Sequence, residues 1–368
     1  MRIGLFIDTF NLGGAETMLL DIAGLLKASG HTPILLHFGN PYLNEYAAKH
    51  GLENYVVPNH KAYKKTLTLP IFAFKTISFL KKLQLDCLHT HLFGSITGMA
   101  VPAKLAGIRH VGTLHDVYTI EEAPKRINLL KMAVAFGTKL IAVSSPMRNF
   151  YQARGNFKPE SLTFVANFVP AYAHSGDRAE VRAELGVNEQ DFVIFSVGRL
   201  VSLKRFDLII DAAKICKQTH SDKNIKIFIA GGGELEQPLK QQIAQTQTQG
   251  VVTLLGERND IPKLLSAADT FVLASDTEGM SRSILEAMAA ELPIIATDVG
   301  GNSDLVVPDQ NGYLVPPNNA SALAEKFGFL AGEQEICNKF STCSKQFAIS
   351  KFGAEQFLAQ HLANYQGK

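Results

Sequence analysis

Short apolar runs alternate with longer segments of helical periodicity along most of the chain. Five runs in the first half are typical of buried strands: residues 3–7, 33–37, 87–89, 110–114 and 140–143. The segments with helical spacing between them cover residues 15–28, 68–83, 94–106 and 127–136. Strands that alternate with helices form a parallel sheet covered by its crossover helices, so the pattern predicts an α/β fold.

The alternation is interrupted near residues 170–190, which are polar and poor in apolar runs. It resumes with the run FVIFSV at residue 192, and four more strands are expected at residues 225–230, 251–254, 270–274 and 294–296. Two doubly wound halves in series account for this pattern. We therefore expect one Rossmann-like domain over residues 1–170 and a second over residues 171–345.

Composition supports a folded protein with two cores. Of 368 residues, 46% are hydrophobic and 19% are charged, which excludes the disordered class. The net charge of +2 gives no reason to expect nucleic acid as a partner. The first residues, MRIGLFIDTF, fit a buried strand better than a signal peptide, and no run approaches the roughly 18 apolar residues of a membrane span. We expect a cytoplasmic protein, attached at most peripherally to the inner face of the membrane.

Two glycine-rich segments follow predicted strands. Gly13 and Gly14 open the first helix, where backbone N–H groups can approach an anion, and a plain tight turn is the alternative. A Rossmann dehydrogenase is not favoured, because the pattern GxGxxG is absent. The segment IAGGGELE, with Gly232 at its centre, fits either close approach to a ligand or a turn against the neighbouring strand.

Two cations bracket the loop after the first strand of the second half. They are Arg199 and Lys204, in SVGRLVSLKRFD. Ligands of open α/β sheets bind outside the carboxyl ends of the strands, and two cations there suit a diphosphate. A solvated loop is the alternative.

The stretch SDTEGMSRSILEAMAAELPIIATDVGGNSD, residues 275–304, includes the glutamates Glu278 and Glu286 and a glycine pair. Glu278 lies in the loop beyond a strand, and Glu286 lies on the next helix, for which Ser281 is the expected N-cap. Glu286 falls on an otherwise apolar face, where a carboxylate needs a partner such as sugar hydroxyls, a lysine or water. The two glutamates fit a pair of acceptors that face one polyol-rich ligand.

Several of these segments together resemble one enzyme family. SVGRLVSLKRFDLIIDAA, LASDTEGMSRSILEAMAAELPIIATDVGG and NGYLVPP resemble the donor half of family 4 glycosyltransferases, whose mark is two glutamates separated by seven residues. GGAE, THLFG, TLHD and AVSS resemble its acceptor half. The resemblance covers nearly the whole chain. It implies the GT-B fold, in which two Rossmann-like domains face a central cleft, and a C-terminal helix, residues 346–368, that returns to the N-terminal domain.

The resemblance also implies an activity. The protein would be a retaining glycosyltransferase that moves a sugar from a nucleotide-sugar donor, a UDP-sugar by family habit, to a glycan or lipid-linked acceptor in cell-surface polysaccharide synthesis. No cofactor and no metal are implied, and no DxD sequence occurs. A nucleotide-sugar epimerase of the same fold is one alternative, which the pair of glutamates does not support. A non-catalytic nucleotide-sugar binding protein is another, which would have lost the acceptor-side histidine, His115.

Roles can be carried over residue by residue. The catalytic set would be His115, Glu278, Arg199 and Lys204. The donor-binding set would be Gly14, Arg199, Lys204, Gly232, Glu278, Gly279, Met280, Ser281 and Glu286, and the acceptor side would include Gly13 and His91. Arg199 and Lys204 would hold the diphosphate, Glu286 the ribose hydroxyls and Glu278 the donor sugar. The run His89-Thr90-His91 fits packed side chains better than a metal site, since no third ligand lies nearby.

A few positions depart from the family pattern. Met280 and Ser281 replace the more usual Phe-Pro, and Phe follows Asn167 where Gly is usual. Arg205 and Glu291 stand where glycine is common. If Glu291 adopts a left-handed conformation, it costs on the order of 1 kcal/mol relative to glycine.

One further segment, KAYKKTLTLPIFAFKTISFLKKL, is both basic and apolar. Residues 61–83 carry six lysines and three phenylalanines. A cationic, aromatic-rich helix can lie on an anionic membrane surface, and an amphipathic helix with a solvated lysine face is the alternative.

Overall fold

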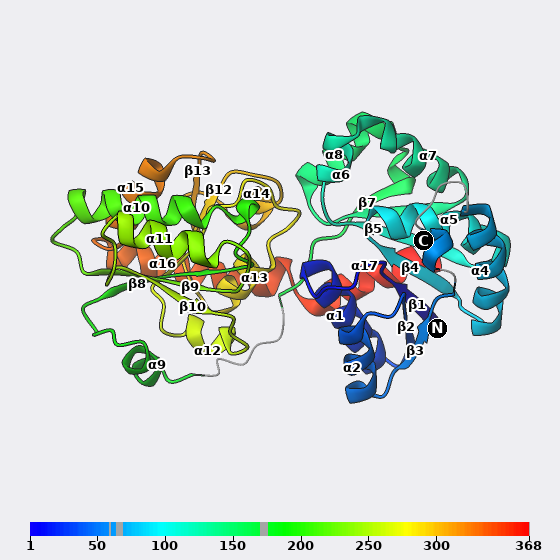
Figure 1. Ribbon diagram of the computed structural model, residues 1–368, viewed down its shortest axis with the longest axis horizontal. Coiled ribbons are helices and arrows are strands. Elements are labelled where there is room, and N and C mark those ends of the chain that lie inside the picture. The colour runs from blue at the N-terminus through cyan, green and yellow to red at the C-terminus, as the bar shows by residue number, and fades with distance from the viewer. Residues whose placement is uncertain (59, 64–68, 170–175, 368) are drawn as a thin grey trace. The chain divides into compact units, whose positions relative to one another are not determined.

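The computed structural model describes residues 1–58, 60–63, 69–169 and 176–367 of the chain. The chain forms two compact units. The first comprises Met1–Asn167 with Ala354–Lys368, and the second comprises Phe168–Gly353. Each unit is a parallel sheet flanked by helices (Figure 1).

The described part of the first unit has seven parallel strands in the order β3-β2-β1-β4-β5-β6-β7. They are β1 Arg2–Phe6, β2 Thr32–His37, β3 Glu53–Val56, β4 Cys87–His91, β5 Arg109–Leu114, β6 Thr138–Ala142 and β7 Leu162–Phe164. The helices are α1 Gly14–Ala28, α2 Pro41–His50, α3 His60–Tyr63, α4 Leu69–Leu83, α5 Phe93–Ala106, α6 Tyr118–Glu122, α7 Ile127–Ala135, α8 Ser145–Gly155 and α17 Ala354–Gln366, with 3₁₀ turns at Pro124–Arg126 and Pro159–Ser161. The five strands predicted here are confirmed to within a few residues.

The second unit has six parallel strands among its described residues, in the order β10-β9-β8-β11-β12-β13. They are β8 Phe192–Val197, β9 Ile225–Ala230, β10 Val252–Gly256, β11 Thr270–Leu273, β12 Ile294–Thr297 and β13 Gly312–Val315. The helices are α9 Arg178–Glu184, α10 Phe206–Thr219, α11 Glu236–Gln245, α12 Ile261–Leu265, α13 Arg282–Ala289, α14 Asn302–Leu305, α15 Ala320–Leu330 and α16 Gln334–Lys351, with a 3₁₀ turn at Ser202–Lys204. Residues 170–175 of the predicted polar linker lie outside the described residues.

The strand order reverses at one point in each sheet. In the first unit β1 lies between β2 and β4, and in the second unit β8 lies between β9 and β11. Successive connections leave such a pair of strands in opposite directions, which opens a crevice beyond their carboxyl ends. We therefore expect a ligand of the second unit to bind at the carboxyl ends of β8 and β11.

The end of the chain forms two helices, and the single helix expected over residues 346–368 is wrong in its bounds. The helix α16 ends at Lys351 within the second unit, and α17 begins at Ala354 within the first. Figure 1 shows α17, in red, among the blue and cyan elements of the first unit. Its Tyr365 is fully buried, and the Tyr365 hydroxyl lies 2.8 Å from Nδ1 of His89 on β4.

Two residues at positions where the family favours glycine have left-handed backbones. Arg205 has φ 48° at the start of α10, and Glu291 has φ 59° just after α13. Side chains offset part of the strain. Arg205 bonds to Asp207 and Asp276, and Lys345 Nζ lies 2.6 Å from Glu291 Oε1.

We predict that Glu291→Gly stabilises the second unit. Glycine removes a left-handed strain of about 1 kcal/mol, and the exposed ion pair with Lys345 offsets less than about 1 kcal/mol of that gain. Urea denaturation should show a higher free energy of unfolding for the variant, and the gain should be clearest in a Lys345→Met background. Glu291→Ala, which loses the ion pair and keeps the strain, is the control. Equal stability of the Gly and Ala variants would contradict the prediction.

Candidate active site

The loops after β8 and β11 meet at the carboxyl end of the second sheet. Lys204 Nζ lies 2.6 Å from Glu278 Oε1, although the two residues are 74 positions apart in the sequence. Ser275, two residues after the end of β11, donates its hydroxyl to the same oxygen at 2.6 Å. The side chains of Lys204 and Glu278 are only 25% and 10% exposed. The structure thus brings together two of the residues expected to carry the chemistry.

Further contacts fix these two loops to each other. The Asp276 backbone N–H donates to the Leu203 carbonyl at 2.9 Å, and the Arg205 guanidinium donates to Asp276 Oδ1 at 3.1 Å. Arg205 also contacts Asp207 and the side-chain oxygen of Asn318. The position of Lys204 is therefore set by backbone and ion-pair contacts on both sides.

Arg199 lies in the same loop and is exposed. Its side chain makes no hydrogen bond or ion pair with the residues that the structure describes. A guanidinium carries its charge at every physiological pH and can bind two oxygens of one phosphate. The site therefore combines a paired cation, Lys204, with a cation on the solvent side that can still bind an anion.

The glycine pair after β12 allows a third loop to reach Glu278. Gly300 has φ 48°, and a Cβ atom there would lie 1.8 Å from the Glu278 carbonyl oxygen. The N–H of Gly301 donates to that oxygen at 3.3 Å. Only glycine permits this approach, so the pair holds the backbone of Glu278 in place.

Glu286 has its partner on its own helix. Arg282 Nε donates to Glu286 Oε1 at 2.9 Å, and the Glu286 side chain is 12% exposed. Sequence reasoning missed Arg282, although a spacing of four residues on a helix indicates such a pair. The N-cap is confirmed, since the Ser281 hydroxyl accepts the Ile284 N–H at 3.3 Å. Met280 and Ser281 are both buried.

The triple glycine after β9 packs against the loop after β8. A Cβ atom on Gly231 would lie 1.9 Å from the Gly198 carbonyl oxygen. The Gly232 carbonyl accepts the Leu200 N–H at 2.9 Å. Of the two explanations for this segment, contact with the neighbouring strand's loop is the one that these contacts support.

In the first unit, an acidic side chain accepts a hydrogen bond from the backbone of the glycine pair. Glu16 is buried, and its Oε2 accepts the Gly13 N–H at 2.9 Å. The Thr9 hydroxyl donates to the other oxygen of Glu16. A carboxylate of the chain itself thus lies at the start of α1, where an anion was expected. A Cβ atom on Gly14 would meet nothing within 4 Å.

A cluster of histidines lies at the carboxyl ends of β4 and β5. His91 Nδ1 lies 2.9 Å from His115 Nε2, and the rings of His89 and His91 pack 4.3 Å apart. Burial lowers the pKa of His115 to about 4 and the pKa of His91 well below its usual value, so both rings are neutral at pH 7. The described residues contain no group of three His, Cys, Asp or Glu side chains placed to hold a metal ion.

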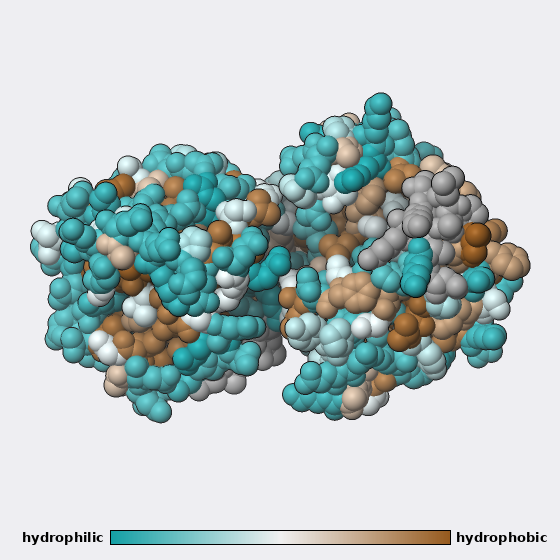
Figure 2. All heavy atoms as spheres, viewed as in Figure 1, coloured by the Kyte–Doolittle hydropathy of each residue, from teal (hydrophilic) through white to brown (hydrophobic). Residues whose placement is uncertain are grey.

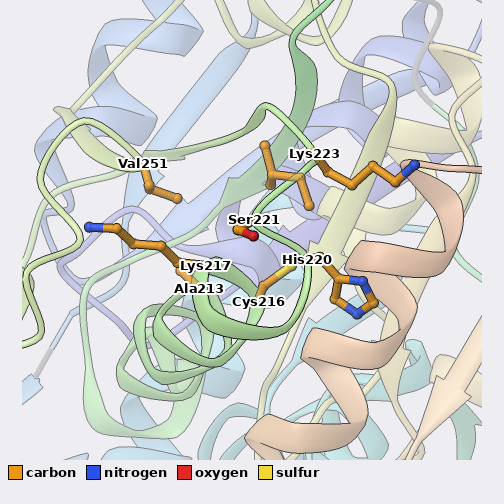
Figure 3. A pocket seen from close by; sticks show the side chains of 8 residues that line it. Ala213, Cys216, Lys217, His220, Ser221, Lys223 and Val251 are labelled. Carbon is orange, nitrogen blue, oxygen red and sulfur yellow. The ribbon is translucent and has the colours of Figure 1, made fainter.

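A separate cavity of about 250 Å³ lies at the amino ends of β9 and β10, away from these loops. Its lining includes Cys216, Lys217, His220 and Lys223 (Figure 3). Figure 3 shows the two lysines pointing away from the cavity, and the Lys217 ammonium donates to the Gln247 carbonyl at 2.8 Å. The ammonium groups of the two lysines therefore do not converge on this cavity.

Two family models cover most of the chain. Residues 12–171 match the model described as Glycosyltransferase Family 4, and residues 177–347 match the model described as Glycosyl transferases group 1.

Several known proteins are similar to most of this chain. A UDP-Gal:alpha-D-GlcNAc-diphosphoundecaprenol alpha-1,3-galactosyltransferase of Escherichia coli is 32% identical over 65% of each chain. The Bacillus subtilis (strain 168) teichuronic acid biosynthesis glycosyltransferase TuaC is 30% identical over 72% of this chain and 68% of its own. The crystal structure of Anabaena Alr3699/HepE in complex with UDP matches with a TM-score of 0.87 over 100% of both chains at 21% identity. At that identity the match establishes the fold alone.

We predict that the first unit loses stability as the pH falls from about 6.5 toward 4. Burial lowers the pKa of His110 to about 3 and those of His115 and His361 to about 4. The unfolded chain then binds more protons than the folded one below about pH 6.5, at roughly 1.4 kcal/mol per pH unit for each such histidine.

Urea denaturation at pH 7.5, 6 and 5 tests this expectation against His110→Gln, which removes one of these groups. The stability of the variant should depend less steeply on pH. The same slope for variant and wild type would contradict the prediction.

Proposed function

Because the chain belongs to the family 4 glycosyltransferases and is a glycosyltransferase of the GT-B fold, we propose that it transfers a sugar from a UDP-sugar. The acceptor would be a glycan or lipid-linked sugar in cell-surface polysaccharide synthesis. The transfer would retain the anomeric configuration of the sugar. The E. coli relative is named for UDP-Gal and a diphosphoundecaprenol-linked acceptor, TuaC is named for teichuronic acid, and the Anabaena protein holds UDP. Retention of the anomeric configuration is typical of family 4 glycosyltransferases.

The contact between Lys204 and Glu278 carries this proposal, together with the exposed Arg199 in the same loop as Lys204. Departure of a nucleoside diphosphate develops negative charge on its phosphates, and cations already in place stabilise that charge without reorganisation. Arg199 and Lys204 would bind the diphosphate. Glu278 would orient Lys204 through one carboxylate oxygen and accept hydroxyls of the donor sugar with the other.

The remaining donor contacts would come from α13 and the neighbouring loops. Glu286, held by Arg282, would accept the ribose hydroxyls through its carboxylate. Because Met280 and Ser281 are buried, residues 279–281 would contact the sugar or phosphates through their backbone. Gly232 would line the donor site through its backbone, beside the loop that carries Arg199.

The first unit would supply the acceptor side and one catalytic group. His115 is neutral, so it can donate a hydrogen bond without adding a charge. Gly14, where no side chain intrudes, would lie near the phosphates or the acceptor, and Gly13 and His91 would support the acceptor side. We propose no cofactor and no metal, because Arg199 and Lys204 supply the positive charge that a metal would otherwise bring to the diphosphate.

Calorimetric titration with UDP-, GDP- and ADP-sugars, in EDTA and without added metal, tests the proposal. We expect a UDP-sugar to bind. Binding of a GDP- or ADP-sugar alone would contradict the assignment of the base, and binding only after a metal is restored would contradict the metal-free mechanism. Conversion of the bound donor to its epimer, with no acceptor required, would contradict transfer.

We predict that substitutions in the two units affect different kinetic quantities, donor affinity in one case and kcat in the other. Glu286→Ala should weaken donor binding by roughly tenfold, the cost of lost hydrogen bonds to a charged group. His115→Ala should lower kcat more than it changes donor affinity. Calorimetry and initial rates separate the two effects, and Glu325→Ala, at a 70% exposed position on α15, is the control. Unchanged donor affinity in Glu286→Ala would remove the ribose assignment.

We also propose that α4 attaches the protein to the cytoplasmic face of the membrane. Residues 64–68 of the predicted segment lie outside the described residues. Within α4, Phe72 and Leu80 are buried, as an ordinary amphipathic helix requires, whereas Ile71 is 53% and Phe74 79% exposed. Figure 2 shows apolar side chains on the surface over α4, and Lys75, Lys81 and Lys82 are also exposed. No helix among the described residues is long and apolar enough to cross a bilayer.

Co-sedimentation with phosphatidylglycerol-containing vesicles tests this attachment. Phe74→Ser should reduce vesicle binding by roughly tenfold, since the variant would lose the burial of the Phe74 ring in the apolar part of the membrane. Ile349→Ser, at a 70% exposed apolar position on α16, is the matched control. Equal binding of Phe74→Ser and wild type, or equal binding to phosphatidylcholine vesicles, would contradict the proposal.

A further inference from the structure

The buried histidines of the first unit differ in how their ring nitrogens are satisfied. His89 Nδ1 lies 2.8 Å from the Tyr365 hydroxyl, and Nε2 lies 2.7 Å from the Thr113 hydroxyl. His110 likewise lies between the hydroxyls of Thr138 and Thr90, at 2.8 and 3.0 Å. A hydroxyl can donate or accept. Either tautomer of His89 can therefore be satisfied, and both ring nitrogens of His110 have a hydroxyl partner.

His91 has no such freedom. Its Nδ1 lies 2.9 Å from His115 Nε2, and its Nε2 is buried with no hydrogen-bond partner among the residues that the structure describes. The His91 side chain is fully buried, with 0% exposure. A neutral imidazole carries one proton, so one nitrogen donates and the other can only accept.

The hydrogen bond between His91 and His115 can be made in two ways. If His115 donated through Nε2, the His91 proton would lie on its own Nε2, as a buried N–H with nothing to accept it. If His91 donates through Nδ1, only a lone pair stays unpaired at Nε2. Buried donors without an acceptor are rarer in proteins than buried acceptors without a donor. The second arrangement is therefore the favoured one.

We infer that His91 is a positioning residue that holds His115 in the tautomer protonated at Nδ1. The Nε2 of His115 accepts from His91, and its Nδ1 makes no hydrogen bond with the described part of the chain. His115 is half-buried, so Nδ1 is the nitrogen left for a substrate. In this tautomer, Nδ1 of His115 presents an N–H group to the substrate. A general base at this atom is excluded, because a protonated nitrogen has no lone pair to take a proton.

This inference rests on the proposed function for its consequence in catalysis. When the donor is bound, the Nδ1–H group of His115 donates a hydrogen bond to a sugar hydroxyl or a phosphate oxygen. No proton is transferred. His91 acts only through His115. Its effect therefore lies in the tautomer and orientation of that ring.

Nitrogen NMR of the protein labelled with ¹⁵N-histidine tests the inference without any substrate. The signals of His115 are those that His115→Gln removes. At pH 7.5 we expect a protonated Nδ1 and an unprotonated Nε2 for His115. The reverse pattern, or signals averaged between the two tautomers, would overturn the inference in the wild-type spectrum alone.

Two variants separate positioning from packing. His91→Asn keeps an amide donor near the place of Nδ1, and the Nδ1–H signal of His115 should persist. His91→Leu removes the donor, so His115 should shift toward the Nε2–H tautomer, and kcat should fall about tenfold, the effect of one hydrogen bond in the transition state. An unchanged His115 signal in His91→Leu would overturn the inference. Absence of transfer by a wild-type protein with the expected spectrum would contradict the proposed function and leave the tautomer assignment standing.

Discussion

The ion pair between Lys204 and Glu278 is the contact on which the second unit's site depends. It joins the loops that follow β8 and β11, the strands between which the sheet changes direction. An ion pair this little exposed loses hydration, and its Coulomb attraction compensates only when the remaining hydrogen bonds are made. Ser275 supplies one of them, and the contact of Arg205 with Asp276 braces the same two loops. Lys204 is thereby held in place before any ligand arrives, which is the condition for cations to stabilise developing charge.

A different constraint shapes the first unit, where neutral imidazoles take the place of charges. His89, His110 and His361 are buried and each reaches a hydroxyl or a carbonyl, and the C-terminal helix α17 provides two of those partners, Tyr365 and Phe357. Because burial disfavours imidazolium, the cluster stays neutral at pH 7. The orientation of these rings therefore depends on hydrogen bonds and ring packing rather than on ion pairs, and we infer that His91 orients His115.

The alternation of apolar runs was enough to predict the two parallel sheets, and the rule for open α/β sheets placed Arg199, Lys204 and Glu278 at one edge. The short strands β3, β7 and β13 were not predicted, because three or four half-buried residues leave no clear period. The pairing of Lys204 with Glu278 depends on side-chain reach, and the pairing of His91 with His115 depends on a register in which His91 lies opposite Thr113. Arg282 could have been found from its spacing to Glu286. The contact of Gly300 with the Glu278 backbone could not, since it joins loops that the sequence does not place in contact.

The central claim is that the carboxyl-end loops of the second sheet bind a nucleoside diphosphate. Amide hydrogen exchange with and without UDP tests it most directly, because exchange locates the bound ligand along the chain. The account predicts slower exchange on UDP binding at residues 199–204, 278–282 and 300–301. Slower exchange confined to residues 216–223, around the cavity at the amino ends of β9 and β10, would contradict it, as would UDP binding with no change in the three loops.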